Sequence, residues 1–257
     1  MQLNPGKKRN GIHSGALRTW GMLFVAAGVV SRSVLQRSLL GLGSISGAQL
    51  LETMSASESA MMIATMALVL QVLEACAVPI FAFLAVEGFT HTSDFKKYIL
   101  RVLGLAALTE IPYNLALSGK FLDFSSRNPV FGIFLALVVL GFYKHYEGKS
   151  VKNVSIKAVI TVSAMLWVGM LGIEYGMPMV LIAAVLWALR RNTLLANVAG
   201  ATVSILCSLN SLFMMAAPMS FLAIHSYNGE KGEGNRAVNY LAYPTLLLGC
   251  FLAGLVL

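Results

Sequence analysis

Charged residues are scarce in this sequence, and their scarcity argues against an ordinary soluble enzyme. Asp, Glu, Lys and Arg make up only 12% of the 257 residues, whereas 57% are hydrophobic and the mean hydropathy is +0.75. A soluble globular domain carries about 25% charged residues. The composition instead predicts an all-α integral membrane protein, and the length suits a single helical bundle over residues 1–257.

Several common site motifs are also missing. The three cysteines, Cys76, Cys207 and Cys250, lie in apolar runs without a CxxC or Cys/His spacing, so we expect no structural zinc or other metal site. No GxxxxGK motif marks a nucleotide-binding loop. No internal repeat is visible, which argues modestly against transporter folds built from duplicated halves.

Long apolar runs predict membrane-spanning helices, each of which needs about 20 mainly apolar residues. We expect about nine spans, with eight or ten as alternatives. Their approximate ranges are 16–36, 58–90, 97–118, 128–143, 155–173, 176–190, 192–208, 210–226 and 239–257. The second run is too long for a plain crossing, so it is tilted, kinked near Pro79 or extends beyond the membrane. Near the end, Pro218 and the pair Asn210–Ser211 mark either a turn or a kink.

The basic residues follow a membrane pattern, so the net charge of +8 requires no nucleic-acid partner. Clusters of Lys and Arg occur within residues 7–18, 96–101, 144–157, 190–191 and 231–236. Segments nearly free of these residues separate the clusters, and short loops rich in Lys and Arg stay in the cytoplasm. This alternation predicts a multi-pass protein with a cytoplasmic N-terminus. Lys120 and Arg127 are exceptions, because they fall in a predicted outside loop.

Residues 79–114 concentrate ionisable side chains in and beside two predicted spans. They include Glu87, His91, Arg101 and Glu110. An ionisable side chain at membrane depth costs at least about 2.5–3.5 kcal/mol on insertion scales, so it usually faces a partner or a cavity. The segment therefore predicts a polar pocket within the membrane.

Glu87 and His91 are four residues apart and would share one face of a continuous helix. A carboxylate beside an imidazole orients the ring and raises its basicity, as general acid–base catalysis requires. The alternative is that His91 only ends a helix at the membrane surface, close to Asp94. The spacing thus predicts a catalytic pair but leaves a surface role open.

On the next span, Glu110, Tyr113 and Asn114 share a face by their spacing of three and four residues. Pro112 frees a backbone carbonyl in the preceding turn, as often occurs at binding sites in membrane helices. We expect a functional role for Glu110. The alternative is a protonated Glu110 that makes a buried hydrogen bond between helices.

Other polar residues within the spans give weaker signals. Gln71 and Glu74 are three residues apart on the second span and are interpreted as hydrogen-bonding groups between helices. Arg32 and Arg37 lie towards the outer end of the first span, where their side chains could reach the membrane interface. These four residues are not predicted to form a site.

A family resemblance rests on motifs that occur in a fixed order along the chain. They are PIFAFLAVEGFTHT at 79–92, KYILR at 97–101, EIPY at 110–113, EYG at 174–176, YNG at 227–229, KG at 231–232 and the tyrosines of YLAYP at 240–244. Together they resemble the TraX family, most strongly over residues 75–250. The family's namesake is implicated in acetylating the N-terminus of conjugative pilin. The family is itself similar to multi-span acyltransferases that use cytoplasmic acyl-CoA.

The resemblance implies an acyltransferase of the bacterial cytoplasmic (inner) membrane. Acetyl-CoA would be the co-substrate, with no permanently bound cofactor, and the acceptor would be an amine or hydroxyl of a pilin N-terminus or an envelope component. The implied catalytic residues are His91, Glu87 and Glu110. Lys96, Lys97 and Arg101 would meet the CoA phosphates. The implied substrate contacts are Tyr113, Asn114, Asn128, Glu174, Tyr175, Tyr227, Asn228 and Tyr243.

Three positions depart from the family pattern. The first span usually carries an Asp-His pair near its end, where the corresponding stretch of this chain reads Gly28-Val-Val-Ser31-Arg32, and a Gly-Arg is replaced by Glu74-Ala75. The histidine two residues after Tyr-Pro is here Leu246. If the Asp-His pair supplies the catalytic base, either His91 with a carboxylate substitutes for it or the chain does something else.

Two other classes of function stay open on the sequence. One is a transporter or permease subunit, with Glu87 and Glu110 as substrate or proton sites. The other is a non-catalytic membrane partner that retains the family scaffold. The sequence names neither the acceptor nor the oligomeric state.

Overall fold

In the computed structural model, every regular element of the described residues is a helix, which confirms the all-α part of the predicted fold class. The structure describes residues 11–41, 57–148, 150–232 and 236–256, and for 236–239 it describes the backbone alone. The elements in chain order are α1 (Ser14–Val30), η1 (Ser31–Leu39), α3 (Glu58–Ala75), α4 (Ala77–His91), α5 (Phe95–Ser118), α6 (Val130–His145), α7 (Val151–Met170), α8 (Gly176–Ala188), α9 (Thr193–Cys207), η2 (Leu212–Met219), α10 (Ser220–His225) and α11 (Arg236–Val256).

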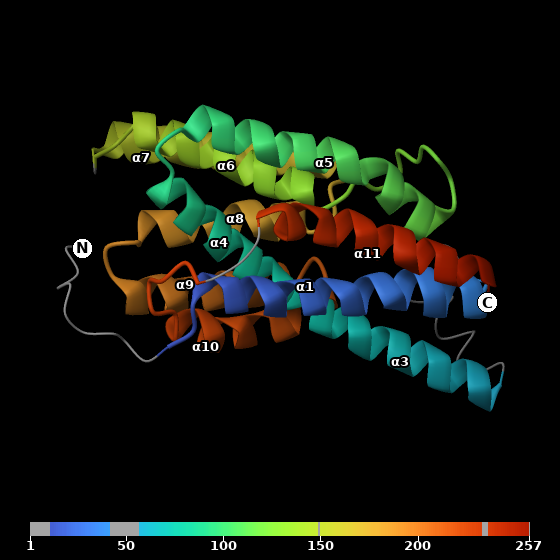
Figure 1. Ribbon diagram of the computed structural model, residues 1–257. Helices are drawn as coiled ribbons and strands as arrows, with labels where there is room; N and C mark the ends of the chain where they lie inside the picture. The colour runs from blue at the N-terminus through green and yellow to red at the C-terminus, as the bar shows by residue number, and fades with distance from the viewer. Residues whose placement is uncertain (1–10, 42–56, 149, 233–235, 257) are drawn as a thin grey trace.

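The helices lie lengthwise in an elongated bundle, and α4 crosses it obliquely (Figure 1). At its centre, α8 packs against α4, α6, α7 and α9. Most α8 side chains are buried, including Ile182 and Trp187. A helix that is apolar on every side needs such an enclosed position. Around it, α5 packs against α6 and α11, and α1 packs against α3 and α4.

Three helical runs are long and apolar enough to cross a membrane: Glu58–His91, Phe95–Ser118 and Val151–Met170. The outer helix α7 shows the membrane character most clearly. Of its residues, only Thr161 and Val168 are buried, whereas large apolar side chains such as Leu166, Trp167 and Met170 are exposed. Extended apolar surfaces of this kind are rare on soluble monomers.

The kink predicted near Pro79 is present as a break between α3 and α4 at Cys76. Pro79 has no N–H to donate to the carbonyl of Ala75, so the regular hydrogen-bond ladder is interrupted there. The Ser220 hydroxyl donates to the Cys76 carbonyl, beside the break, at 2.6 Å. This hydrogen bond ties the bend in the long run to α10.

Two predicted spans are not simple α-helices. The first continues from α1 into the π-helix η1, where the Leu40 N–H donates to the Leu35 carbonyl five residues back. The range 210–226 contains the 3₁₀-helix η2 followed by the short α10. Pro218 lies within η2 and cannot donate a backbone hydrogen bond, which disfavours a continuous α-helix.

Small residues let α6 and α8 approach closely, and we predict that enlarging one of them destabilises the bundle. A Cβ at Gly132 would lie 3.0 Å from the Gly176 Cα, so Gly132→Val forces the two backbones apart. Overpacking of this kind costs about 1–3 kcal/mol. The thermal unfolding midpoint in detergent should fall, whereas Gly169→Val should have a small effect because a Cβ there meets nothing within 4 Å. Equal stability of the two variants would contradict this packing.

Candidate functional site

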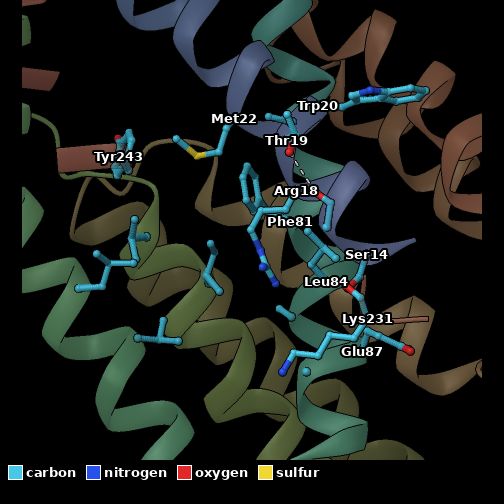
Figure 2. A pocket seen from close by; sticks show the side chains of 18 of the residues that line it. Ser14, Arg18, Thr19, Trp20, Met22, Phe81, Leu84, Glu87, Lys231 and Tyr243 are labelled. Carbon is cyan, nitrogen blue, oxygen red and sulfur yellow. Dashed lines mark hydrogen bonds between the residues drawn. The ribbon is translucent and has the colours of Figure 1, made fainter. Parts of the chain in front are cut away.

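A cavity of about 1280 Å³ lies among α1, α4, α5, α6, α8 and α11. We call one end the mouth: it is lined by His13, Arg18, His91, Arg101 and Lys231, of which the last three are exposed. We call the other end the inner end: it is lined by Glu74, Tyr175 and Tyr243, which are buried or half-buried. Figure 2 places Glu87 and Lys231 at one side of the view and Tyr243 at the other.

The mouth is basic and is built partly by the N-terminal segment. The Ile12 N–H donates to the Ser226 carbonyl at 2.8 Å, and the Asn228 N–H donates to the Ile12 carbonyl at 3.0 Å. The Ser14 hydroxyl donates to the Lys231 carbonyl at 2.8 Å. These bonds fix the loop of residues 226–232 against the start of α1, so Arg18 and Lys231 line the same opening.

Glu87 lines the cavity and organises two side chains at the mouth. The Tyr227 hydroxyl donates to Glu87 Oε1 at 2.9 Å, and the His91 Nδ1 lies 3.4 Å from the same oxygen. Burial, together with the neighbouring Glu87 carboxylate, raises the pKa of the Tyr227 hydroxyl, so it stays a neutral donor. His91 also lies 3.0 Å from the Glu87 backbone carbonyl, and two-thirds of its side chain is exposed. The predicted pair is therefore adjacent, at the mouth.

The inner end is held by a buried group of charged and phenolic side chains. Arg32 pairs with both Glu74 and Glu174. The Tyr113 hydroxyl donates to Glu174 Oε2 at 2.7 Å, and the Tyr175 hydroxyl donates to Glu74 Oε2 at 3.3 Å. The network joins η1, α3, α5 and the turn before α8. We call these five residues the Arg32 cluster.

Local backbone features make room for the Arg32 cluster. A Cβ at Gly28 would overlap the Glu74 carboxylate, so glycine there lets the carboxylate lie against α1. Tyr175 adopts a left-handed conformation with φ of 52°, which is uncommon for a residue other than glycine. That conformation begins α8 and lets the Tyr175 ring line the cavity.

Glu110 lies outside the cavity lining and is engaged by the loop before α6. Asn128 Nδ2 donates to Glu110 Oε2 at 2.6 Å, and Arg127 Nη1 lies 3.4 Å from Oε1. The Asn128 backbone N–H also donates to Oε2. The predicted residues Glu110 and Asn128 are thus brought together, in an arrangement that anchors this loop to α5.

The remaining predicted site residues divide into two groups. Tyr227 lines the mouth, where Asn228 lies in the adjoining loop, and Tyr175 and Tyr243 line the inner end. Glu174 and Tyr113 lie behind the inner end, within the Arg32 cluster. Asn114 is buried on α5 away from the lining, and its Oδ1 has no hydrogen-bond partner among the described residues.

Of the three cations predicted to bind CoA, Arg101 lines the cavity, whereas Lys96 and Lys97 are exposed beside it. Lys97 Nζ pairs with Asp94 at 3.1 Å. Asp94 begins α5 as its N-cap, and the hydrogen bond from the Lys97 backbone N–H lowers the pKa of the Asp94 carboxyl. Asp94 and Lys97 therefore stabilise the start of α5 and do not line the cavity.

Four lining or supporting residues were not predicted from the sequence: Arg18, Arg32, Glu74 and Lys231. Arg32 and Glu74 were interpreted as an interfacial arginine and a structural hydrogen-bonding group. Their opposite charges on two different spans were the available signal, because an isolated charge within a span requires a partner. Spacing along the chain could not show that they pair, since they are 42 residues apart.

A family model described as TraX protein matches residues 37–253, which is most of the chain. The chain belongs to the TraX family. No curated protein and no solved structure matches it. TraX membership and the apolar helices together indicate a membrane protein.

Two of the departures from the TraX pattern lie together in the structure. Arg32 belongs to the stretch 28–32 and Glu74 to the pair 74–75, two places at which the sequence departs from the resembled pattern. The structure pairs these two side chains with each other. This member of the TraX family therefore has an oppositely charged pair in which the basic residue lies on the first span.

Removal of Arg32 should strongly destabilise the protein. In Arg32→Gln, the buried carboxylate of Glu74 and the half-buried carboxylate of Glu174 lose their shared cation, and breaking a buried ion pair in this way costs about 3–5 kcal/mol. Unfolding in detergent, followed by circular dichroism, measures the loss. Arg191→Gln is the control because Arg191 is exposed, and surface changes cost about 0.5 kcal/mol or less.

Adding Glu174→Gln to Arg32→Gln should recover part of that stability, because it removes one of the two unpaired carboxylates. An Arg32→Gln variant as stable as the Arg191→Gln control would show that the cluster does not hold the bundle together.

Proposed function

We propose that this TraX protein is an acyltransferase that takes an acyl group, most simply acetyl, from acyl-CoA bound at the mouth. Family membership suggests a membrane protein that modifies pilin in conjugation, so the acceptor is a pilin N-terminus or another envelope component. The observation that carries the proposal is the cavity itself, which joins a basic mouth to a buried inner end.

The charge at the mouth suits a CoA nucleotide. Arg18, Arg101 and Lys231 line the opening, and cations there favour a ligand with several phosphate groups. Arg101 was predicted for this role. Lys96 and Lys97 add positive charge beside the mouth without lining it.

The size and lining of the cavity suit two substrates. Small-molecule sites are usually about 300–1,000 Å³, and this cavity is larger. Its middle section carries apolar side chains, including Phe81, Leu84 and Ile133, which can pack along an uncharged pantetheine arm. Acyl-CoA bound with its nucleotide at the mouth would then extend its thioester towards the inner end.

The Glu87–His91 pair is one candidate for the base that acyl transfer requires. The two side chains are adjacent, and Tyr227 holds the Glu87 carboxylate in place. A base removes the proton from the acceptor as the new bond forms, so it must reach the reacting atoms. The exposure of His91 at the mouth supports a role for this pair close to the proposed entrance of the donor.

Acyl-CoA is a cytoplasmic metabolite, so the proposal requires a mouth that faces the cytoplasm. The predicted multi-pass topology of the inner membrane places residues 1–18, 91–97, 144–154, 190–192 and 227–237 on that side. His91, Arg101 and Lys231 lie in or beside those segments. The predicted topology therefore agrees with the proposed donor, because it has the mouth on the side of the membrane where acyl-CoA occurs.

Cysteine labelling tests this orientation. In a variant without Cys76, Cys207 and Cys250, Lys152→Cys should react with an impermeant maleimide only after the cells are permeabilised. Leu122→Cys, at an exposed position in the loop before α6, should react in intact cells. Labelling of position 152 from outside would reverse the orientation.

Measurement of CoA binding tests the proposed donor. Arg101→Gln and Lys231→Gln should each weaken acetyl-CoA binding by roughly ten- to a hundredfold, because a charge-assisted contact is worth about 1.5–3 kcal/mol. Isothermal titration calorimetry on purified protein in nanodiscs measures the affinity. Lys97→Gln is the matched control, since it removes one charge beside the mouth but outside the lining.

An equal loss of affinity in Lys97→Gln would show that diffuse surface charge, and not the mouth, attracts the ligand. Wild-type protein that neither binds acetyl-CoA at millimolar concentration nor hydrolyses it would exclude acyl transfer and favour a transport or scaffold role.

A further inference from the structure

The inner end carries an unbalanced buried charge. The two carboxylates of Glu74 and Glu174 share the single guanidinium of Arg32, which leaves one formal negative charge in the Arg32 cluster. The other titratable groups around Glu74 are the phenols of Tyr113, Tyr175 and Tyr243, which are neutral. Net charge is costly in a medium of low dielectric constant, so this group gains from taking up one proton or one cation.

Of the two carboxylates, Glu74 is the one that can accept a proton or a cation from the cavity. Glu174 does not line the cavity, whereas Glu74 does. Glu74 Oε1 accepts from Arg32, while Oε2 accepts from the Tyr175 hydroxyl at 3.3 Å. The usual O–H···O separation is about 2.7–2.8 Å, so the bond to Oε2 is long and leaves that oxygen weakly engaged.

A second group at the inner end also lacks a partner. Tyr243 on α11 is only 7% exposed and lines the cavity, yet its hydroxyl makes no hydrogen bond to any described residue. Its oxygen is not fully enclosed by protein, so the hydroxyl is open to the cavity and can donate a hydrogen bond to a ligand or water there. Glu74 Oε2 and the Tyr243 hydroxyl therefore offer an acceptor and a donor to the same space.

We propose that the inner end binds the acyl acceptor and that Glu74 removes its proton. This inference rests on the proposed acyl transfer and assigns its second substrate site. The acceptor's heteroatom forms a bond to the thioester carbonyl carbon, its proton passes to Glu74 Oε2, and the carbon–sulfur bond breaks. The same proton then returns to the departing CoA sulfur, so the products are the acylated acceptor and CoA thiol.

The electrostatics favour this direction of proton transfer. When Glu74 accepts a proton, the Arg32 cluster becomes formally neutral, whereas a proton taken by a neutral buried base such as an imidazole would create a charge. His91 lies at the other end of the cavity with two-thirds of its side chain in solvent. Glu74 is also the carboxylate that Gly28 positions by leaving room for it beside α1.

The test measures CoA thiol release from acetyl-CoA by purified protein in nanodiscs, with water as the acceptor. Glu74→Gln keeps the shape and the hydrogen bond to Arg32 but cannot take a proton. Turnover should fall by at least about a hundredfold, as expected for loss of a general base, while acetyl-CoA affinity stays within about threefold of wild type. Glu58→Gln, an exposed carboxylate on the same helix α3, should retain full turnover.

Two further variants separate proton transfer from a structural role. Gly28→Ala keeps the carboxylate but displaces it, and should lower turnover in the same way. Glu74→Asp retains a carboxylate in the same surroundings of Arg32, Glu174, Tyr175 and Tyr243, so a measurable rate should remain with a displaced acid limb in its pH profile.

Wild-type turnover in Glu74→Gln or Gly28→Ala would overturn the assignment, as would a loss of turnover confined to His91→Ala. A parallel loss of CoA affinity in Glu74→Gln would also overturn it, because Glu74 would then hold the donor or the fold. Wild-type protein that shows no binding or hydrolysis of acetyl-CoA refutes the proposed function instead, so the two failures are distinguishable.

Discussion

The two ion pairs of Arg32 are the constraint on which the rest of the structure depends. One guanidinium connects η1 to α3 through Glu74 and to the turn before α8 through Glu174. Away from water, oppositely charged groups attract each other strongly, and an unpaired charge is far more costly than in solution. The three elements cannot shift relative to one another without separating these charges. The inner end of the cavity therefore has a fixed geometry before any ligand enters.

The cavity has a polarity gradient that follows from this constraint. Cations collect at the mouth, apolar side chains such as Phe81 and Leu84 line the middle, and the inner end is acidic and phenolic. A ligand with a phosphate-rich head and an uncharged, reactive tail matches that order in one orientation only. Productive binding would thus come from complementarity along the whole cavity, and orienting reactants in this way supplies a large part of catalysis.

The helices could be predicted because the length of an apolar run is a local property of the chain. Each predicted span overlaps a helix of the structure; Pro218 signalled the irregular stretch that contains η2, whereas the π-helix η1 has no such local signal. Within the site, Glu87 and His91 were predicted together because helical spacing brings residues four apart onto one face. Arg32 and Glu174 are 142 residues apart, and no spacing rule encodes their meeting. Sequence reasoning therefore found the Glu87–His91 pair and, through the family resemblance, several tyrosines of the inner end, but it did not find the ion pairs of Arg32.

Arg32 and Glu74 form an oppositely charged pair that joins the first span to α3. The attraction between two buried charges depends on their opposite signs and their separation, and it does not depend on which helix carries which sign. Arg32 and Glu74 belong to two stretches at which this sequence departs from the resembled pattern, and the structure pairs them between the first span and α3. Arg32 binds one oxygen of the Glu74 carboxylate, and Glu74 lines the inner end of the cavity. The ion pair thus holds a buried carboxylate at the inner end, the group that we propose removes the acceptor's proton.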